Sequence, residues 1–181
     1  MTAIEILRNE HALILQMLAL LEHHLRQVAA GAALDREFAR WVVDFSREFA
    51  DDTHHAKEEG VLFGWLESRG LSRASGPLGA MLVDHQRCRS QAQDMAGALA
   101  RADVAAFAAL AGELAQVLRR HMASEGENLF RLAEQLMTPA EDVAAVQAFG
   151  RVVREREGAL VRSRHLAAIE RWRRSFGLPP F

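Results

Sequence analysis

Hydrophobic residues recur at helical spacing along most of the chain, and no stretch alternates apolar and polar residues as a half-buried strand would. Thr2 and Glu5 form a capping-box signature near the N-terminus, and Gly31 is suited to end a helix. Between them, one helical face carries Ile4, Leu7, His11, Ile14, Leu15, Leu18 and Leu25. The pattern therefore predicts a first helix between Thr2 and Gly31, with His11 in the middle of its buried stripe.

The same spacing predicts three further long helices, separated by turn signals. Asp35 can cap a second helix that runs unbroken to Gly70. A loop rich in Ser and Gly follows at residues 71–76, and Pro77 suits the first position of a third helix. Asp103 can cap a fourth helix that continues through Leu136. Because short connections make consecutive helices antiparallel neighbours, we expect an all-α fold, an up-down antiparallel four-helix bundle.

A fifth helical segment is predicted after the bundle. Thr138, Pro139 and Glu141 provide a cap, a proline at the first helical position and a glutamate at the third. The segment extends to about Ser175, with a bend near Gly158. We therefore expect a bundle over residues 1–137 and a C-terminal helical extension packed on it over residues 138–181. The pattern leaves open whether the extension covers a site in the bundle or pairs two copies of the chain as a homodimer.

Composition narrows the class of protein further. Of the 181 residues, 50% are hydrophobic and 25% charged, which is typical of a globular domain. A net charge of −2 gives no electrostatic reason to expect a nucleic-acid partner. The most apolar run, residues 12–21, is too short to span a membrane and lacks the flanks of a secretory signal, so we expect a cytoplasmic protein. Cys88 is the only cysteine, which excludes an internal disulfide and a thiolate-rich metal site.

Two segments far apart in the chain share one skeleton: a histidine, a glutamate four residues later, and then Leu-Phe. The matching residues are His54, Glu58, Leu62 and Phe63 in the first segment and His121, Glu125, Leu129 and Phe130 in the second. Residues four apart on an α-helix are offset by only about 40°, so each histidine points the same way as its glutamate. Each segment can therefore supply an imidazole and a carboxylate to one metal site.

The first and third helices add one histidine each. His11 follows Glu10, and His85 follows Asp84, both on apolar stripes. Each half of the bundle then has one histidine on its first helix and a His/Glu pair on its second, a pattern of internal duplication. The pattern predicts a dinuclear metal site between the halves, with two histidines for each metal and both carboxylates bridging. The predicted ligands are His11, His54, Glu58, His85, His121 and Glu125.

The chemistry of these side chains favours metal ions over an unfilled polar core. Burying imidazoles and carboxylates without partners among leucines costs several kcal/mol for each ion. Imidazole nitrogens and carboxylate oxygens suit divalent iron, with manganese or zinc as alternatives. Such a centre would keep open positions for dioxygen, peroxide, nitric oxide or water. The competing interpretation is a bundle whose histidines lie on its surface.

These residues resemble the hemerythrin-like cation-binding (HHE) domain over about residues 3–137. The most specific part is the string His-His-x-x-Glu-Glu-x-x-Leu-Phe at residues 54–63. The resemblance implies a four-helix bundle around two iron ions bridged by an oxo or hydroxo group. It also implies a protein that binds or senses dioxygen, nitric oxide, peroxide or iron.

The chain departs from the oxygen-carrying members of this family. Those members have a second histidine one turn after the third-helix ligand, where this chain has Arg89. They use an aspartate five residues after the fourth-helix histidine, whereas Glu125 lies four residues after it. His55 is a candidate seventh ligand, because Glu58 lies between His54 and His55 on a helical wheel. An iron-sensing relative uses a carboxylate at that place, and the alternative for His55 is a residue at the edge of the core.

The sequence leaves open whether the protein is an enzyme. A di-iron site with open positions can turn over peroxide or nitric oxide, or donate iron to damaged iron–sulfur centres, and a structural bundle with a zinc-filled site is the remaining alternative. Around the site, Glu10, Glu59 and Asp84 are candidate acceptors for ligand imidazole N–H groups. Lys57, the only lysine, is assigned no function, and His23 and His24 are expected to be exposed.

Overall fold

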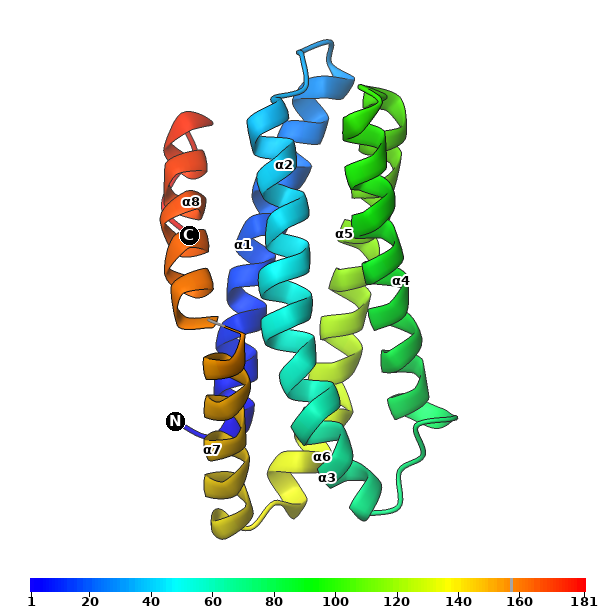
Figure 1. The fold of residues 1–181 in the computed structure, drawn as a ribbon, viewed down its shortest axis with the longest axis vertical. Coiled ribbons are helices and arrows are strands. Elements are labelled where there is room, and N and C mark those ends of the chain that lie inside the picture. Colours follow the sequence, from blue (N-terminus) through cyan, green and yellow to red (C-terminus); the bar gives the residue numbers. More distant parts are fainter. Residues whose placement is uncertain (157) are drawn as a thin grey trace.

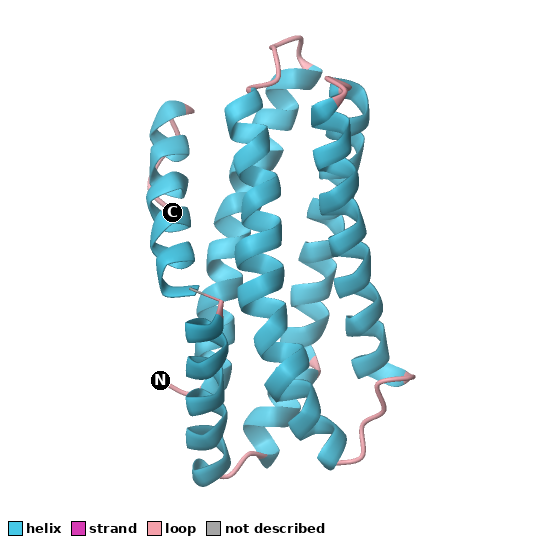
Figure 2. Ribbon diagram, viewed as in Figure 1, coloured by secondary structure: helices cyan, strands magenta, loops and turns pink. Residues whose placement is uncertain are grey.

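The computed structural model describes residues 1–156 and 158–181, and within them all regular structure is helical (Figure 2). The predicted all-α class is therefore confirmed. In chain order the elements are α1 (Ala3–Ala29), α2 (Arg36–Asp44), η1 (Phe45–His55), η2 (Glu58–Leu62), α3 (Phe63–Ser68), α4 (Gly76–Ala100), α5 (Val104–Glu127), α6 (Leu129–Leu136), α7 (Pro139–Glu155) and α8 (Gly158–Ser175).

Long helical segments lie side by side in the body of the molecule (Figure 1). They are α1, the continuous path from α2 to α3, α4 and α5, and α4 packs most extensively on α5. The C-terminal helices α7 and α8 follow one another along the outside, where both contact α1 and α8 also contacts η1 (Figure 1).

The predicted helix starts are confirmed by their caps. The Thr2 hydroxyl accepts the Glu5 backbone N–H at 3.1 Å, and the Glu5 carboxylate accepts the Thr2 N–H at 2.7 Å. Thr138 and Glu141 form the same reciprocal pair at the start of α7. Each box satisfies backbone donors that the first helical turn leaves free. Side-chain caps also begin α2 and α5, at Asp35 and Asp103.

The second helix is not the unbroken α-helix predicted from the sequence. Its middle is wound as π-helix in η1 and η2, in which each hydrogen bond spans five residues instead of four. In an α-helix, neighbouring side chains are about 100° apart, so only one of His54 and His55 should face fully inward. The wider π-turn reduces that separation, and both rings are buried, at 0% and 1% exposure.

The fourth helix also differs from its prediction, because it breaks at Asn128 between α5 and α6. The Asn128 side-chain amide donates to the Ser124 backbone carbonyl at 2.7 Å, beside the Asn128 backbone N–H, which donates to the same carbonyl at 3.0 Å. After the break, α6 leaves the direction of α5 (Figure 1). Leu129 and Phe130 of the repeated skeleton nevertheless point inward and are buried.

The apolar core is divided into two clusters along the length of the helices. One contains Ile14, Leu18, Phe45, Phe107 and Leu118 among its members. The other contains Leu7, Phe63, Leu78, Phe130 and Phe149. On each long segment the predicted ligands fall where one cluster gives way to the other, and on α5 Met122 of the first cluster lies between His121 and Glu125. The candidate site is therefore a buried polar layer with apolar packing on both sides.

His165 attaches α8 to the bundle. The Trp41 indole N–H donates to His165 Nδ1 at 3.1 Å, and His165 Nε2 then donates to the Glu48 carboxylate at 3.0 Å. The ring is 2% exposed, and Arg164 pairs with the same carboxylate. This histidine is therefore a packing residue, with both ring nitrogens used.

Replacing His165 with leucine should weaken this attachment. The Trp41 N–H would lose its acceptor, and an unsatisfied buried donor costs about 1–3 kcal/mol. The free energy of unfolding, measured with urea, should fall by that amount. Ser163→Ala, on the exposed face of α8, is the matched control and should leave the urea midpoint of unfolding unchanged. Equal stability of the two variants would contradict this role for His165.

Candidate metal centre

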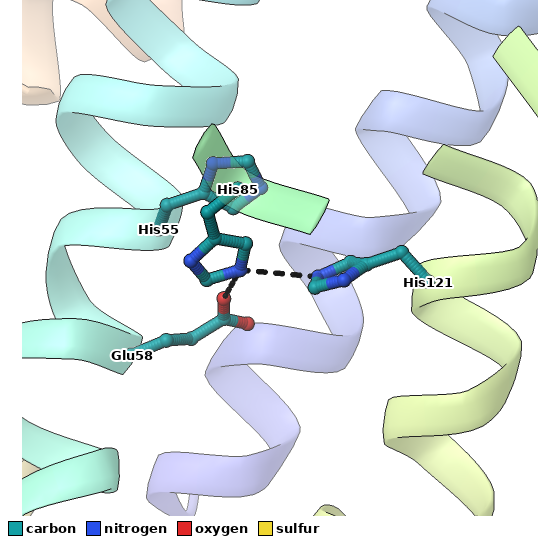
Figure 3. A group of neighbouring side chains, drawn as sticks. All are labelled: His55, Glu58, His85 and His121. Atoms are coloured by element: carbon teal, nitrogen blue, oxygen red, sulfur yellow. Dashed lines mark hydrogen bonds and ion pairs between the residues drawn. The ribbon is translucent and has the colours of Figure 1, made fainter. Parts of the chain in front are cut away.

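The structure brings all seven predicted ligands together in two groups, within each of which one ligand atom per residue lies within 4.8 Å of the others. The three-imidazole group contains His55, Glu58, His85 and His121 (Figure 3). The two-carboxylate group contains His11, His54, Glu58 and Glu125. Glu58 belongs to both groups. The imidazoles are thus divided three and two, whereas the sequence pattern led us to expect two and two.

Every long helical segment contributes to the two groups. The path from α2 to α3 supplies His54, His55 and Glu58, and the π-helical winding lets one segment place three side chains inward. The remaining members come from α1, α4 and α5. Six of the seven are at most 1% exposed, and His11 is 8% exposed. This burial excludes the interpretation that the histidines lie on the surface.

Glu58 directs its two oxygens at different groups. Its Oε1 atom lies 3.0 Å from His54 Nε2, and its Oε2 atom lies 3.2 Å from His85 Nε2 (Figure 3). Glu125 is also placed between rings, because its Oε2 atom is 3.3 Å from His11 Nε2 and 3.7 Å from His121 Nε2. Glu58, which belongs to both groups, can bridge two cations, whereas Glu125 belongs to the two-carboxylate group alone.

Many of the converging atoms are buried without a hydrogen-bond partner. They are Nε2 of His11, His54 and His55 and both oxygens of Glu58 and of Glu125. Buried polar atoms in native proteins are nearly always satisfied, so such a concentration requires an explanation. Imidazole nitrogens and carboxylate oxygens are the ligands that divalent transition metals take. The residues present therefore fit a pair of divalent cations.

Carboxylates stand behind four of the five rings, on the side away from the cluster. Three Nδ1 atoms are hydrogen-bonded to a carboxylate, His54 to Glu10 at 3.1 Å, His85 to Glu59 at 2.7 Å and His55 to Asp51 at 3.3 Å. The fourth carboxylate, Asp84, lies 3.7 Å from His121 Nδ1, too far for a hydrogen bond. An acceptor at Nδ1 places the proton there and leaves Nε2 free to bind a metal. Three of these acceptors were predicted from the sequence, and Asp51 was missed.

Lys57 is a further residue that the sequence analysis missed. Its side chain is 1% exposed, and its ammonium group forms an ion pair with Glu10 Oε1, while Glu10 Oε2 contacts His54 Nδ1. The ammonium therefore compensates a buried carboxylate that orients a ring of the two-carboxylate group. Its position could have indicated this role, because the only lysine of the chain lies between the predicted ligands His54 and Glu58.

The buried charges shift the protonation of the cluster. Burial lowers the pKa of His54, but the Glu58 charge and the contact with Glu10 outweigh burial and raise it to about 9. Burial, followed by the neighbouring Glu58 charge, raises the pKa of Glu125 well above its usual range. Burial and the His54 charge lower the pKa of His11 to about 3. At neutral pH the cluster therefore holds a proton on His54 that a bound cation would displace, and the raised pKa of Glu125 shifts that carboxyl toward its protonated form.

The other histidines of α1 serve packing. His24 was expected to be exposed, but it is only 4% exposed, because its Nε2 atom accepts the Asp35 backbone N–H at 3.0 Å and its ring packs on Phe38. That expectation was wrong. His23 is half-buried and lies against Phe176. Neither residue belongs to the two groups.

Comparison with protein families gives one match, to the model of the hemerythrin HHE cation binding domain, over residues 2–133. Comparison with curated proteins gives no significant match. Comparison with solved structures gives none either. The matched range includes all seven residues of the two groups and covers most of the chain. The chain therefore belongs to the hemerythrin HHE cation-binding domain family.

Proposed function

We propose that this chain is a non-haem di-iron protein whose centre binds or senses dioxygen, nitric oxide, peroxide or iron. The observation that carries the proposal is Glu58, whose two buried oxygens face the two groups separately. In this proposal one ion is held by His55, His85 and His121, the other by His11, His54 and Glu125, and Glu58 bridges them. Membership of a cation-binding family supports metal binding in general, and the nitrogen and oxygen ligands favour iron.

The proposal includes the arrangement of the chain around the centre. Residues 1–137 form an up-down antiparallel four-helix bundle, and residues 138–181 form an extension packed against it. The contacts of α7 and α8 with α1 support this division. Whether the extension also pairs two copies of the chain stays a prediction.

Two iron ions in this site would supply open coordination positions and electrons for a small ligand. The protein controls access to them. Phe63 stacks near His85 at 5.7 Å and Phe130 near His11 at 5.2 Å between ring centres, and both exclude water. Because His11 is the most exposed ring of the two groups, we propose that small ligands approach beside it, along α1.

Among the described residues, no helix combines the length and the apolar character that crossing a membrane requires. A cytoplasmic location stays a prediction from the sequence.

Aerobic purification followed by metal analysis and absorption spectroscopy tests the proposal. We expect two iron ions per chain and the charge-transfer absorption of a ferric pair. A colourless protein containing zinc would favour a structural bundle, and a protein that binds no metal would contradict the assignment. Consumption of peroxide or nitric oxide at catalytic rates would identify an enzyme, whereas stoichiometric binding would identify a sensor or carrier.

Metal binding should strengthen as pH rises. In the metal-free protein the raised pKa of His54, about 9, keeps that residue protonated at neutral pH, and a cation must displace this proton. The pKa of Glu125 is raised as well, in the same direction. The raised values also stabilise the metal-free fold at low pH, and this stabilisation is lost as pH rises toward about 9. The increase in melting temperature caused by metal should therefore widen between pH 6 and pH 9. A constant increase across this range, measured with and without chelator, would contradict proton displacement.

A further inference from the structure

Arg89 on α4 joins two carboxylates that come from different parts of the second helical path. Its Nε atom donates to both oxygens of Asp51, at 2.8 Å and 3.0 Å, and its NH2 atom donates to Glu59 Oε1 at 2.6 Å. Asp51 lies in η1 and Glu59 in η2. The planar guanidinium therefore holds both carboxylates in one fixed arrangement, which a point charge could not do.

Each of these carboxylates contacts a ring of the three-imidazole group. Glu59 Oε1 lies 2.7 Å from His85 Nδ1, and Asp51 Oδ1 lies 3.3 Å from His55 Nδ1. The two rings are stacked, with centres 3.8 Å apart and planes 16° from parallel. The two outer carboxylates therefore contact the rings on the side away from Nε2, where they can fix how both rings face one cation.

We propose that Arg89 is a positioning residue for the metal ion of the three-imidazole group, acting through Asp51 and Glu59 on His55 and His85. This inference rests on the metal centre proposed above. In this proposal Arg89 orients His55 and His85, which are two of the three imidazoles that bind this ion.

The surroundings explain why the carboxylates need this support. Asp51 and Arg89 line a cavity of about 510 Å³ together with Ser46, Arg47, Asp52 and Gln93. Asp51 and Glu59 have side chains 24% and 27% exposed. Without the guanidinium, water could compete for both carboxylates, and they would be free to rotate away from the rings.

The two-carboxylate group has no such dependence on Arg89. The outer carboxylate of that group is Glu10, which contacts His54 and is paired with Lys57 on the α1 side. Loss of Arg89 should therefore affect one metal ion and spare the other. Removing a group behind a metal-binding histidine typically weakens metal affinity about 10–100-fold.

The experiment is a zinc titration of metal-free full-length protein in competition with a chromophoric chelator, which resolves the two binding steps. The variants are Arg89→Gln and Arg89→Lys. The lysine keeps the positive charge but lacks the planar guanidinium that donates to both carboxylates at once. The control is Arg87→Ala on the same helix, because Arg87 pairs only loosely with Glu113 at 3.7 Å on the surface. His11→Ala, which weakens the two-carboxylate group, identifies the step that belongs to the three-imidazole group.

We expect Arg89→Gln to weaken the three-imidazole step about 10–100-fold and leave the other step unchanged. Arg89→Lys should weaken the same step by a smaller factor, and Arg87→Ala should change neither. Equal weakening of both steps, or no change in either, would overturn the role of Arg89 while leaving the metal centre intact. A wild-type protein that binds no zinc would instead refute the centre itself. If Arg89→Gln does not fold, the selectivity of Arg89→Lys decides the question by the same criterion.

Discussion

The variant that carries both His54→Ala and His121→Ala is expected to purify without metal and with a much lower melting temperature than the wild type. The two substitutions remove one imidazole from each group, so neither ion keeps its ligand set. A ligand that binds only the folded state stabilises it by about 4 kcal/mol at a free concentration of 1,000 times its Kd. Two tightly bound ions can therefore contribute a large part of the total stability. Metal analysis, together with thermal unfolding in the presence and absence of chelator, measures both effects.

His23→Ala is the matched control for this experiment. His23 lies on α1 outside both groups, so its replacement should leave the metal content at the wild-type value. In the double variant, chelator should no longer change the melting temperature. If the double variant retained two metal ions per chain, the ligand assignment would be wrong.

Lys57→Met should destabilise the protein by about 3–5 kcal/mol, measured by urea unfolding in the presence of chelator. The substitution keeps a long side chain but removes the ammonium group that pairs with Glu10. Both partners are buried, with side chains 2% and 6% exposed. The loss would leave the buried Glu10 carboxylate with His54 as its remaining charged partner, at 3.1 Å, and this reduced compensation accounts for the direction of the expected effect.

Two comparisons isolate the buried pair. Combining Lys57→Met with Glu10→Gln should recover much of the stability, because the amide is uncharged and its oxygen can still accept from His54. Arg119→Met should cost less than about 1 kcal/mol, because its pair with Glu22 is exposed at the surface. A Lys57→Met protein no less stable than Arg119→Met would show that Glu10 does not depend on Lys57.

The sequence by itself determined the helical class and the helix starts, and it singled out the seven side chains that the structure brings together. Capping residues such as Thr2 and Thr138 act within one turn, so local chemistry decides them. The repeated spacing of His54–Glu58 and His121–Glu125 is local in the same sense, and burial of His11 and His85 follows from their place on apolar stripes.

The tertiary structure alone decided how these residues are grouped. The π-helical winding of η1 and η2 depends on packing against neighbouring helices, and it brings His55 inward beside His54. The three-and-two division of the rings follows from that winding. The contacts of Arg89 with Asp51 and of Lys57 with Glu10 join residues 38 and 47 positions apart. No local sequence pattern predicts these two contacts, because each forms only when separate helices bring the charged side chains together. In the low-dielectric interior an unpaired charge is costly, so the side chains pair once they are close.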